Sequence, residues 1–205
     1  LCLSGFVRLL KNALFNKEQD NLRDCVVGKV NSGRCFLDVN NRISLDIAKH
    51  LEDIGFLTFR EVIDHPGGVS ILAMDEEGKI FFVRQFRYPF GKMLLELPAG
   101  KLEPGEDPAQ SGRRELREET GCTAGRFESM GSLIPTCAYD TEVIHLFFAS
   151  DLTRGEQDLD ENEFLSVERY TLDEALQMVL SGEIVDAKTQ IGLFKYQALH
   201  NAGRI

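Results

Sequence analysis

The apolar positions of the chain predict a mixed order of strands and helices. Two apolar runs, 69–74 and 79–86, flank the polar turn 75–78, which is typical of two strands joined as a hairpin with a longer loop. Further apolar runs predict three more strands: 127–133, 143–149 and 164–170. Strands and helices mixed in this way predict an α+β sandwich, in which a mixed sheet is covered by helices.

One helix is well defined by its end signals. Asp107 is a good N-cap, Pro108 suits the first helical position, and Gly121 can take the left-handed conformation that ends a helix. The sequence therefore predicts a helix from about Pro108 to Thr120, after the strand-like run LLELPAG.

Two more helices are expected near the carboxyl end of the chain. Thr171 and Glu174 form a capping box for the first of them, and Gly182 is its stop signal. Asp186 is the expected cap of a final helix that runs to about His200.

The first sixty residues are weakly patterned. Strands are expected near 34–39 and 56–63, and their connection, 43–55, has some helical spacing. We therefore expect an N-terminal β-rich lobe over residues 1–65 and a second domain over residues 66–205.

The opening segment has apolar residues at helical spacing. Arg8 interrupts it too early for the core of a signal peptide, and no later run is long enough to span a bilayer. We expect a packing helix here. A helix lying on a membrane surface is the alternative, although two basic residues make a weak polar face.

Composition and charge narrow the class of protein. The 205 residues are 43% hydrophobic and 27% charged, which suits one large globular unit or a compact pair of lobes. A formal net charge of −10 argues against nucleic-acid and anionic-membrane partners, because such binding needs clustered Lys and Arg. The five cysteines are odd in number and form no CxxC pair, which predicts neither a disulfide framework nor a zinc site but a reducing cytoplasm.

Three glutamates crowd the end of the predicted helix at 108–120. Glu115 and Glu119 are four residues apart and so share a face, and Glu118 adds a third negative charge at the negative end of the helix dipole. A cluster that violates local rules is a candidate functional site, and a hard cation such as Mg²⁺ would convert the repulsion into coordination. The alternative is a solvated acidic face that pairs with the neighbouring arginines: Arg113, Arg114 and Arg117.

The spacing around these glutamates is more specific than the cluster itself. The pattern runs Gly100, five residues, Glu106, seven residues, then Arg114-Glu115-Leu116-x-Glu118-Glu119-x-Gly121. Eight fixed residues at average usage would recur by chance on the order of once in a billion starting positions. The pattern resembles the signature of the Nudix hydrolases, except that Cys122 stands where an aliphatic residue is usual.

The resemblance extends over roughly residues 60–199. Five stretches are similar to the ADP-ribose or ADP-sugar pyrophosphatase branch: REVIDHPGGVSIL, VRQFRYP, LLELPAGKLEPGE, DLDENEF and DAKT. The resemblance implies an α/β/α sandwich and a homodimer in which the N-terminal lobe contributes to the partner's substrate pocket. It also implies a small nucleoside diphosphate substrate.

The resemblance also implies roles for the residues of the motif. Glu115 and Glu119 are expected to bind Mg²⁺, or alternatively Mn²⁺, together with the carbonyl of Ala99, and Glu118 is expected to complete or support the metal cluster as a catalytic residue. The other motif residues are expected to be structural: Gly100 for close approach of the loop, Glu106 as partner of Arg114, and Gly121 at the helix end.

Residues outside the motif are expected to complete the site. The acidic loop 156–163 would by composition be a solvated loop, but the resemblance assigns the general base to Glu161 and a further metal ligand to Glu163. Strand alternation places Arg84 and Arg87 on opposite faces, and the resemblance favours Arg87 as the phosphate or ribose contact.

The N-terminal lobe offers further candidates. Arg60 and Glu61 match positions that touch the nucleotide, and a surface ion pair is the competing interpretation. Phe36 could stack on adenine, although an aromatic residue in a strand is more often in the core.

The leading hypothesis is Mg²⁺-dependent hydrolysis of ADP-ribose to AMP and ribose 5-phosphate. Cys137-Ala138 replaces a Pro-Gly pair that is common in the branch, so other nucleotide sugars such as GDP-mannose stay open. Tyr139 lies where dinucleoside polyphosphate hydrolases place a tyrosine. A Nudix module that binds a nucleotide without cleaving it is a further alternative, but the intact motif argues against it. An interaction scaffold leaves the Gly and Arg positions unexplained.

Overall fold

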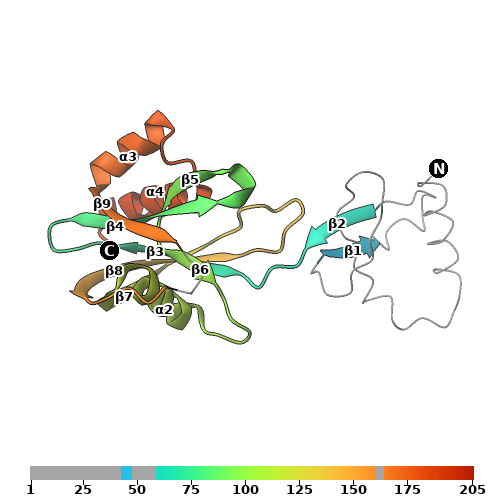
Figure 1. Cartoon of the computed structure of the whole chain (residues 1–205), viewed down its shortest axis with the longest axis horizontal. Coiled ribbons are helices and arrows are strands. Elements are labelled where there is room, and N and C mark those ends of the chain that lie inside the picture. The colour runs from blue at the N-terminus through green and yellow to red at the C-terminus, as the bar shows by residue number, and fades with distance from the viewer. Residues whose placement is uncertain (1–42, 48–58, 160–163) are drawn as a thin grey trace, which may run out of the picture. The chain divides into compact units, whose positions relative to one another are not determined.

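The computed structural model describes residues 43–47, 59–159 and 164–205 (Figure 1). The chain divides into two compact units. The larger unit consists of Pro66–Pro135 and Glu142–Ile205, and Thr136–Thr141 belongs to the smaller unit. The expected opening helix and the strand expected near 34–39 lie outside the described residues.

In the smaller unit, two strands pair in an antiparallel ladder, β1 (Ile43–Ile47) and β2 (Phe59–Ile63). The helical spacing expected from residue 43 onward is wrong for β1, because Ile43, Leu45 and Ile47 alternate with polar residues at the period of a strand. The N–H of Ile63 donates to the carbonyl of Tyr139 at 2.7 Å, which ties the segment Thr136–Thr141 to β2.

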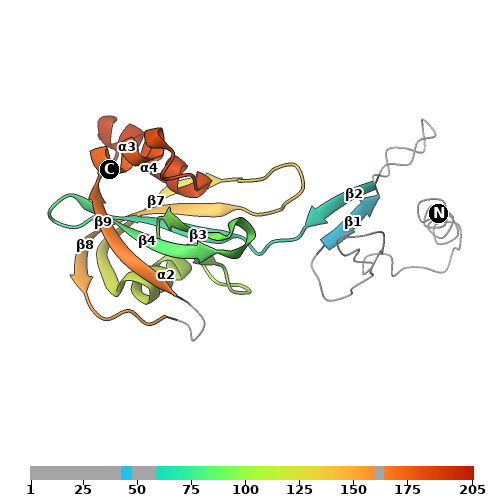
Figure 2. The ribbon, with the colours of Figure 1, turned by 45° about the horizontal axis from the view of Figure 1, so that its top comes forward.

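The larger unit contains two sheets. One has four strands in the order β6-β3-β8-β7: β6 (Ala99–Lys101), β3 (Gly68–Ala73), β8 (Ile144–Arg154) and β7 (Cys122–Leu133). The other has three strands in the order β5-β4-β9: β5 (Lys92–Glu96), β4 (Lys79–Arg87) and β9 (Leu165–Thr171). Figure 2 shows β4 and β9 running side by side. A short 3₁₀ turn, η3 (Tyr88–Phe90), lies between β4 and β5 in the chain.

The expected hairpin of β3 and β4 is corrected by this topology. The turn forms, because Asp75 accepts backbone N–H groups from Glu77 and Lys79 through its carboxylate. The two strands then separate into different sheets, and one bridge between Met74 and Ile80 is all the pairing found here. β3 has no free edge for β4, since it pairs with β6 on one side and in parallel with β8 on the other.

Three helices begin and end where their caps predict. The helix α2 (Pro108–Thr120) starts at Asp107, whose side chain accepts the N–H groups of Ala109 and Gln110, and ends at Gly121 with φ of 72°. The capping box of Thr171 starts α3 (Leu172–Ser181), and Asp186 caps α4 (Ala187–Asn201). These predictions are confirmed.

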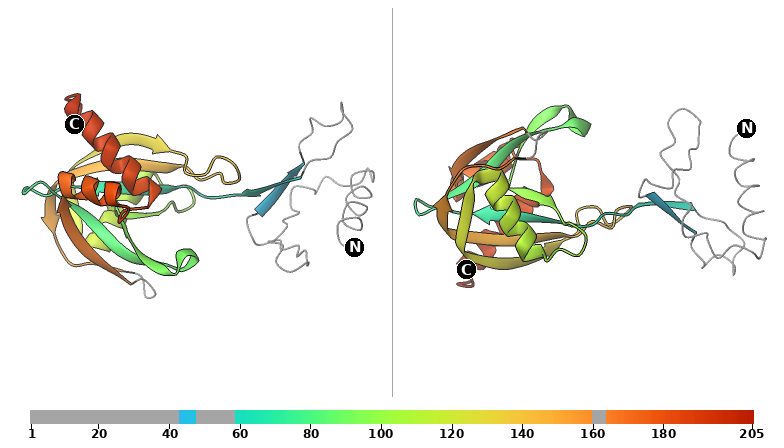
Figure 3. Two further views of the ribbon diagram at one scale, coloured as in Figure 1. Left: turned by 90° about the horizontal axis from the view of Figure 1, so that it is seen from above. Right: turned by 60° about the horizontal axis from the view of Figure 1, so that its bottom comes forward.

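Two apolar clusters lie on the two faces of β3. Leu72 belongs to the cluster that includes residues of α3 and α4, whereas Ile71 belongs to the cluster that includes Leu116 of α2. Figure 3 looks onto these two faces, with α3 and α4 in front in one view and α2 in front in the other. The mixed sheet covered by helices confirms the predicted α+β sandwich.

Within the described part of the chain, no helix is long and apolar enough to cross a membrane.

Candidate active site

The last two turns of α2 bring the glutamates against the short strand β6. The carboxylate of Glu119 is buried and accepts the backbone N–H of Ala99 at 2.9 Å. The carboxylate of Glu115 lies directly over Gly100, where an added Cβ would be 2.0 Å from Glu115 Cδ. A side chain at residue 100 and Glu115 in this position therefore exclude each other.

Arg114 binds three of the neighbouring carboxylates. Its Nε and Nη2 donate to the two oxygens of Glu106, both at 3.0 Å, and its Nη1 donates to Glu115 at 2.7 Å and to Glu118 at 3.0 Å. The hydrogen bonds from Arg114 lower the pKa of Glu106 to about 2. The repulsion predicted between the helix glutamates is thus offset here by one guanidinium.

These residues fit a hard divalent cation in the chemistry of their donors. Carboxylates from Glu115, Glu118 and Glu119 and the carbonyl of Ala99 belong to adjacent elements, and oxygen ligands are those that Mg²⁺ prefers. Among the described residues, no three His, Cys, Asp or Glu side chains are already arranged to hold a metal ion. Here Glu115 and Glu118 are instead bonded to the Nη1 group of Arg114.

A cavity of about 430 Å³ opens in front of the glutamates. Glu115, Glu118 and Arg114 line it from α2, and Arg87 lines it from the end of β4. The remaining lining residues are Gln85, Ala99, Gly100, Lys101 and Glu103. The cavity therefore joins a negative wall suited to cations with a guanidinium suited to phosphate.

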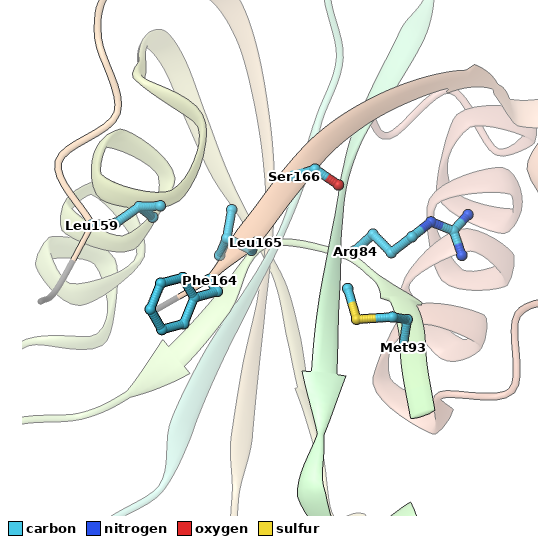
Figure 4. Close-up of a pocket in the computed structure, with 6 residues that line it drawn as sticks. All are labelled: Arg84, Met93, Leu159, Phe164, Leu165 and Ser166. Carbon is cyan, nitrogen blue, oxygen red and sulfur yellow. The ribbon is translucent and has the colours of Figure 1, made fainter. Parts of the chain in front are cut away.

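Arg84 lies away from this cavity, as the alternation along β4 requires. Its guanidinium forms a bidentate ion pair with Glu168 of β9, with Nη2 and Oε2 at 3.1 Å. It also lines a second cavity of about 340 Å³ with Met93, Leu159, Phe164, Leu165 and Ser166. Figure 4 shows the Arg84 guanidinium directed away from Phe164. The part of the cavity wall formed by Leu159, Phe164 and Leu165 is therefore apolar.

The acidic loop begins beside the end of α2. The N–H of Asp158 donates to the carbonyl of Glu118 at 3.0 Å, and its carboxylate pairs with Arg117 at 3.2 Å. Glu161, Glu163 and Phe36 lie outside the described residues. Arg60 and Glu61 lie in β2, in register with Asp46 and Leu45.

Sequence reasoning missed several residues around the cavity. Gln85, Lys101 and Glu103 line it, and Glu96 lies buried beside Arg87. A charged residue inside the apolar run LLEL is the signal that could have identified Glu96, because an acid in a buried strand needs a partner.

Comparison with known proteins agrees with this geometry. Residues 64–189 match the NUDIX domain. The chain belongs to the Nudix domain family. The family predicted from the motif is therefore confirmed.

Several curated relatives align with about two thirds of the chain or more. The ADP-ribose pyrophosphatase of Bacillus subtilis is 42% identical over 68% of this chain and 79% of its own length. The methanol dehydrogenase activator of Bacillus methanolicus is 43% identical over 70% of this chain and 78% of its own length. The GDP-mannose pyrophosphatase of Yersinia enterocolitica is 33% identical over 69% of this chain and 78% of its own length.

The fold has a counterpart among solved structures. A crystal structure of an ADP compounds hydrolase superposes with a TM-score of 0.64 at 21% identity, covering 74% of this chain and 83% of that one. The α/β/α Nudix architecture predicted from the sequence is thereby confirmed.

Proposed function

We propose that this chain is a Nudix hydrolase that cleaves the diphosphate bond of ADP-ribose or a related nucleotide sugar, giving a nucleoside monophosphate and a sugar phosphate. The observation that carries the proposal is the 430 Å³ cavity, which Glu115 and Glu118 of α2 line together with Arg87 of β4. Family membership and the names of the relatives, two of which are ADP-ribose and GDP-mannose pyrophosphatases, support this class of substrate.

The proposed cofactor is Mg²⁺, with Mn²⁺ as the alternative. Glu115, Glu119 and the carbonyl of Ala99 would hold it, with Glu118 completing the cluster. When bound, such an ion neutralises phosphate charge and activates water for attack on phosphorus. Gly100 supports this assignment, because its missing side chain leaves the space that the Glu115 carboxylate takes.

Arg114 can release the ligands without leaving its place. Its bonds to Glu106 use Nε and Nη2, whereas its bonds to Glu115 and Glu118 both use Nη1. Loss of the Nη1 bonds therefore removes the contact of Arg114 with both carboxylates while the bidentate pair still fixes the loop on α2, and Glu118 keeps its contact with Arg117 at 3.3 Å. The structural role proposed for Glu106 rests on this division.

The other residues of the proposed site hold the substrate and move the proton. Arg87 contacts a phosphate or ribose oxygen, and Arg60 and Glu61 contact the nucleotide. Glu161 takes the proton of the attacking water and Glu163 adds a metal ligand. The bonds of Asp158 to α2 support a role for this loop, since Glu161 follows three residues later in the sequence.

Two finer points rest on the sequence and its resemblance. We propose a homodimer in which residues 1–65 contribute to substrate binding, and a cytoplasmic location, which the odd cysteine set without CxxC pairs supports.

A substrate panel tests the proposal. The protein is incubated with Mg²⁺ and ADP-ribose, GDP-mannose, other nucleotide sugars or diadenosine compounds, and the release of AMP, GMP and sugar phosphate is measured. The proposal expects turnover of a nucleotide sugar, with ADP-ribose preferred. Substrate binding without any cleavage would instead support the nucleotide-binding module.

A second candidate function is activation of a dehydrogenase. The relative that is 43% identical is described as a methanol dehydrogenase activator, and its identity to this chain is close to the 42% of the pyrophosphatase. The test is the rate of methanol oxidation by a methanol dehydrogenase with and without this protein. A rise that needs Glu119 would place activation at the same site, and an unchanged rate would remove this candidate.

A further inference from the structure

Glu96 is a carboxylate buried between two leucines at the end of β5. Glu96 is 1% exposed, and its neighbours Leu95 and Leu97 are 1% and 0% exposed. A buried carboxylate is costly unless it is paired and hydrogen-bonded. Its partners therefore show why an acid is kept at this position.

Two cations neutralise Glu96, and one of them lines the cavity. Arg87 donates its Nε and Nη2 to the two oxygens of Glu96 at 2.6 and 2.7 Å. Lys188, which is largely buried, donates to Oε2 of Glu96. Burial alone would raise the pKa of Glu96, but these two cations outweigh it and hold that pKa below its ordinary value.

The chain of contacts continues to the start of α4. Lys188 Nζ also lies 3.0 Å from Asp186, the N-cap of this helix. Asp186 accepts the N–H and the hydroxyl of Thr189, whose oxygen in turn accepts the N–H of Leu97 at 2.8 Å. Charges of alternating sign, from Arg87 through Glu96 and Lys188 to Asp186, thus link the cavity wall to the cap of α4. Glu96 and Lys188 are 92 positions apart in the sequence.

The bidentate pair fixes the orientation of Arg87. A guanidinium has five N–H donors, and Glu96 takes one at Nε and one at Nη2, which leaves the two of Nη1 and one of Nη2 for a ligand. A free arginine side chain has many rotamers, and ordering it on binding costs affinity. Glu96 removes that cost before the substrate arrives.

We propose that Glu96 and Lys188 are positioning residues, which hold Arg87 in the orientation that receives the diphosphate or the ribose. This inference rests on the proposed function and gives a role to the DAKT segment, whose Lys188 and Asp186 form the network. Neither Glu96 nor Lys188 is among the residues that line the cavity.

The competing account is that the network stabilises the fold alone. In that case its loss would lower the melting temperature and leave substrate binding of the folded enzyme unchanged. If the network positions Arg87, its loss should instead raise KM and leave kcat nearly constant, because it weakens the binding of substrate and transition state equally.

A double-mutant cycle separates the two accounts. Glu96→Gln, Arg87→Ala and the double variant are compared with the wild type for KM and kcat, and for the Kd of a non-cleavable methylene analogue of ADP-ribose by calorimetry. We expect Glu96→Gln to raise KM and Kd about tenfold, and to add less than about twofold once Arg87 is already alanine.

Glu168→Gln is the matched control. It breaks a bidentate pair with Arg84 on the same strand, but at the other cavity, and it should leave KM and Kd unchanged. If Glu96→Gln does not fold, Lys188→Gln carries the same cycle, with a smaller rise in KM that also vanishes in the Arg87→Ala background.

The positioning role of Glu96 and the proposed hydrolase function can fail separately in these experiments. Equal effects of Glu96→Gln with and without Arg87, or an unchanged KM and Kd, would overturn positioning while wild-type turnover persists. A wild type that neither binds the analogue nor cleaves any nucleotide sugar would overturn the proposed function, and positioning with it.

Discussion

The carboxylate of Glu115 occupies the space that a side chain on Gly100 would fill. An added Cβ would lie 2.0 Å from both Cδ and Oε1 of Glu115. Because the obstacle is the end of a flexible side chain, a larger residue 100 displaces the carboxylate and leaves the backbone in place.

Gly100→Ala is therefore expected to separate activity from stability. Displacement of Glu115 should lower kcat/KM about 10- to 100-fold, as is typical when the support of a metal ligand is lost. The melting temperature should change little. Steady-state kinetics and thermal unfolding of the same preparation measure the two effects.

Gly78→Ala is the control for this prediction. Gly78 has φ of 74° with nothing within 4 Å of an added Cβ, so alanine there strains the turn without touching the site. We expect a loss of about 1 kcal/mol of stability and full activity. The opposite pattern, with Gly100→Ala fully active, would contradict the proposed role of Glu115.

Glu106 should make stability depend on acid pH. Its pKa falls from 4.5 to about 2 in the folded protein because Arg114 donates to it, so the unfolded chain binds more protons between these values. The stabilisation is complete above about pH 4.5 and is lost as the pH falls toward 2. Urea unfolding of wild type and Glu106→Gln at pH 5 and pH 3 measures it.

The difference between the two proteins should shrink from pH 5 to pH 3. Glu106→Asp, which keeps the charge, is the control and should keep a pH dependence of the wild-type sign. A difference that stays constant with pH would mean that Arg114 does not hold the Glu106 carboxylate.

Asp107 should contribute to stability through the start of α2 alone. Asp107→Ala leaves the N–H groups of Ala109 and Gln110 without their acceptor and should cost about 1 kcal/mol. Thermal unfolding should show a loss of about 2–4 °C. Asp107→Asn keeps the cap and should melt near the wild type, and equal losses for both variants would argue against the cap.

Local signals made the helices predictable. The cap of α2 lies within three residues of the N–H groups that it accepts, and the capping box of Thr171 is equally short. The Nudix motif is local in the same sense, because Glu106, Arg114 and Glu119 lie within one loop and one helix. For these parts, spacing along the chain is enough to predict geometry.

Long-range pairing was not predictable in the same way. Nothing in the runs of β3 and β4 shows that β3 pairs with β8, where Gly68 is opposite Ile144, instead of with its neighbour in sequence. The partnership of Glu96 with Lys188 is equally invisible, since it depends on α4 returning to the end of β5. The sequence indicated that the buried Glu96 needs a cationic partner, but it did not indicate which residue that partner is.

Glu119→Gln tests the central claim most directly. The variant keeps an oxygen for the N–H of Ala99 and the size of the buried side chain, but it removes the anionic ligand. The measurement is Mg²⁺-dependent kcat for ADP-ribose, with the melting temperature showing that the fold is retained. We predict a loss of about a hundredfold or more, since a ligand to the ion supplies several kcal/mol of transition-state stabilisation. An unchanged Mg²⁺-dependent kcat would contradict a metal-assisted diphosphate hydrolase at this site.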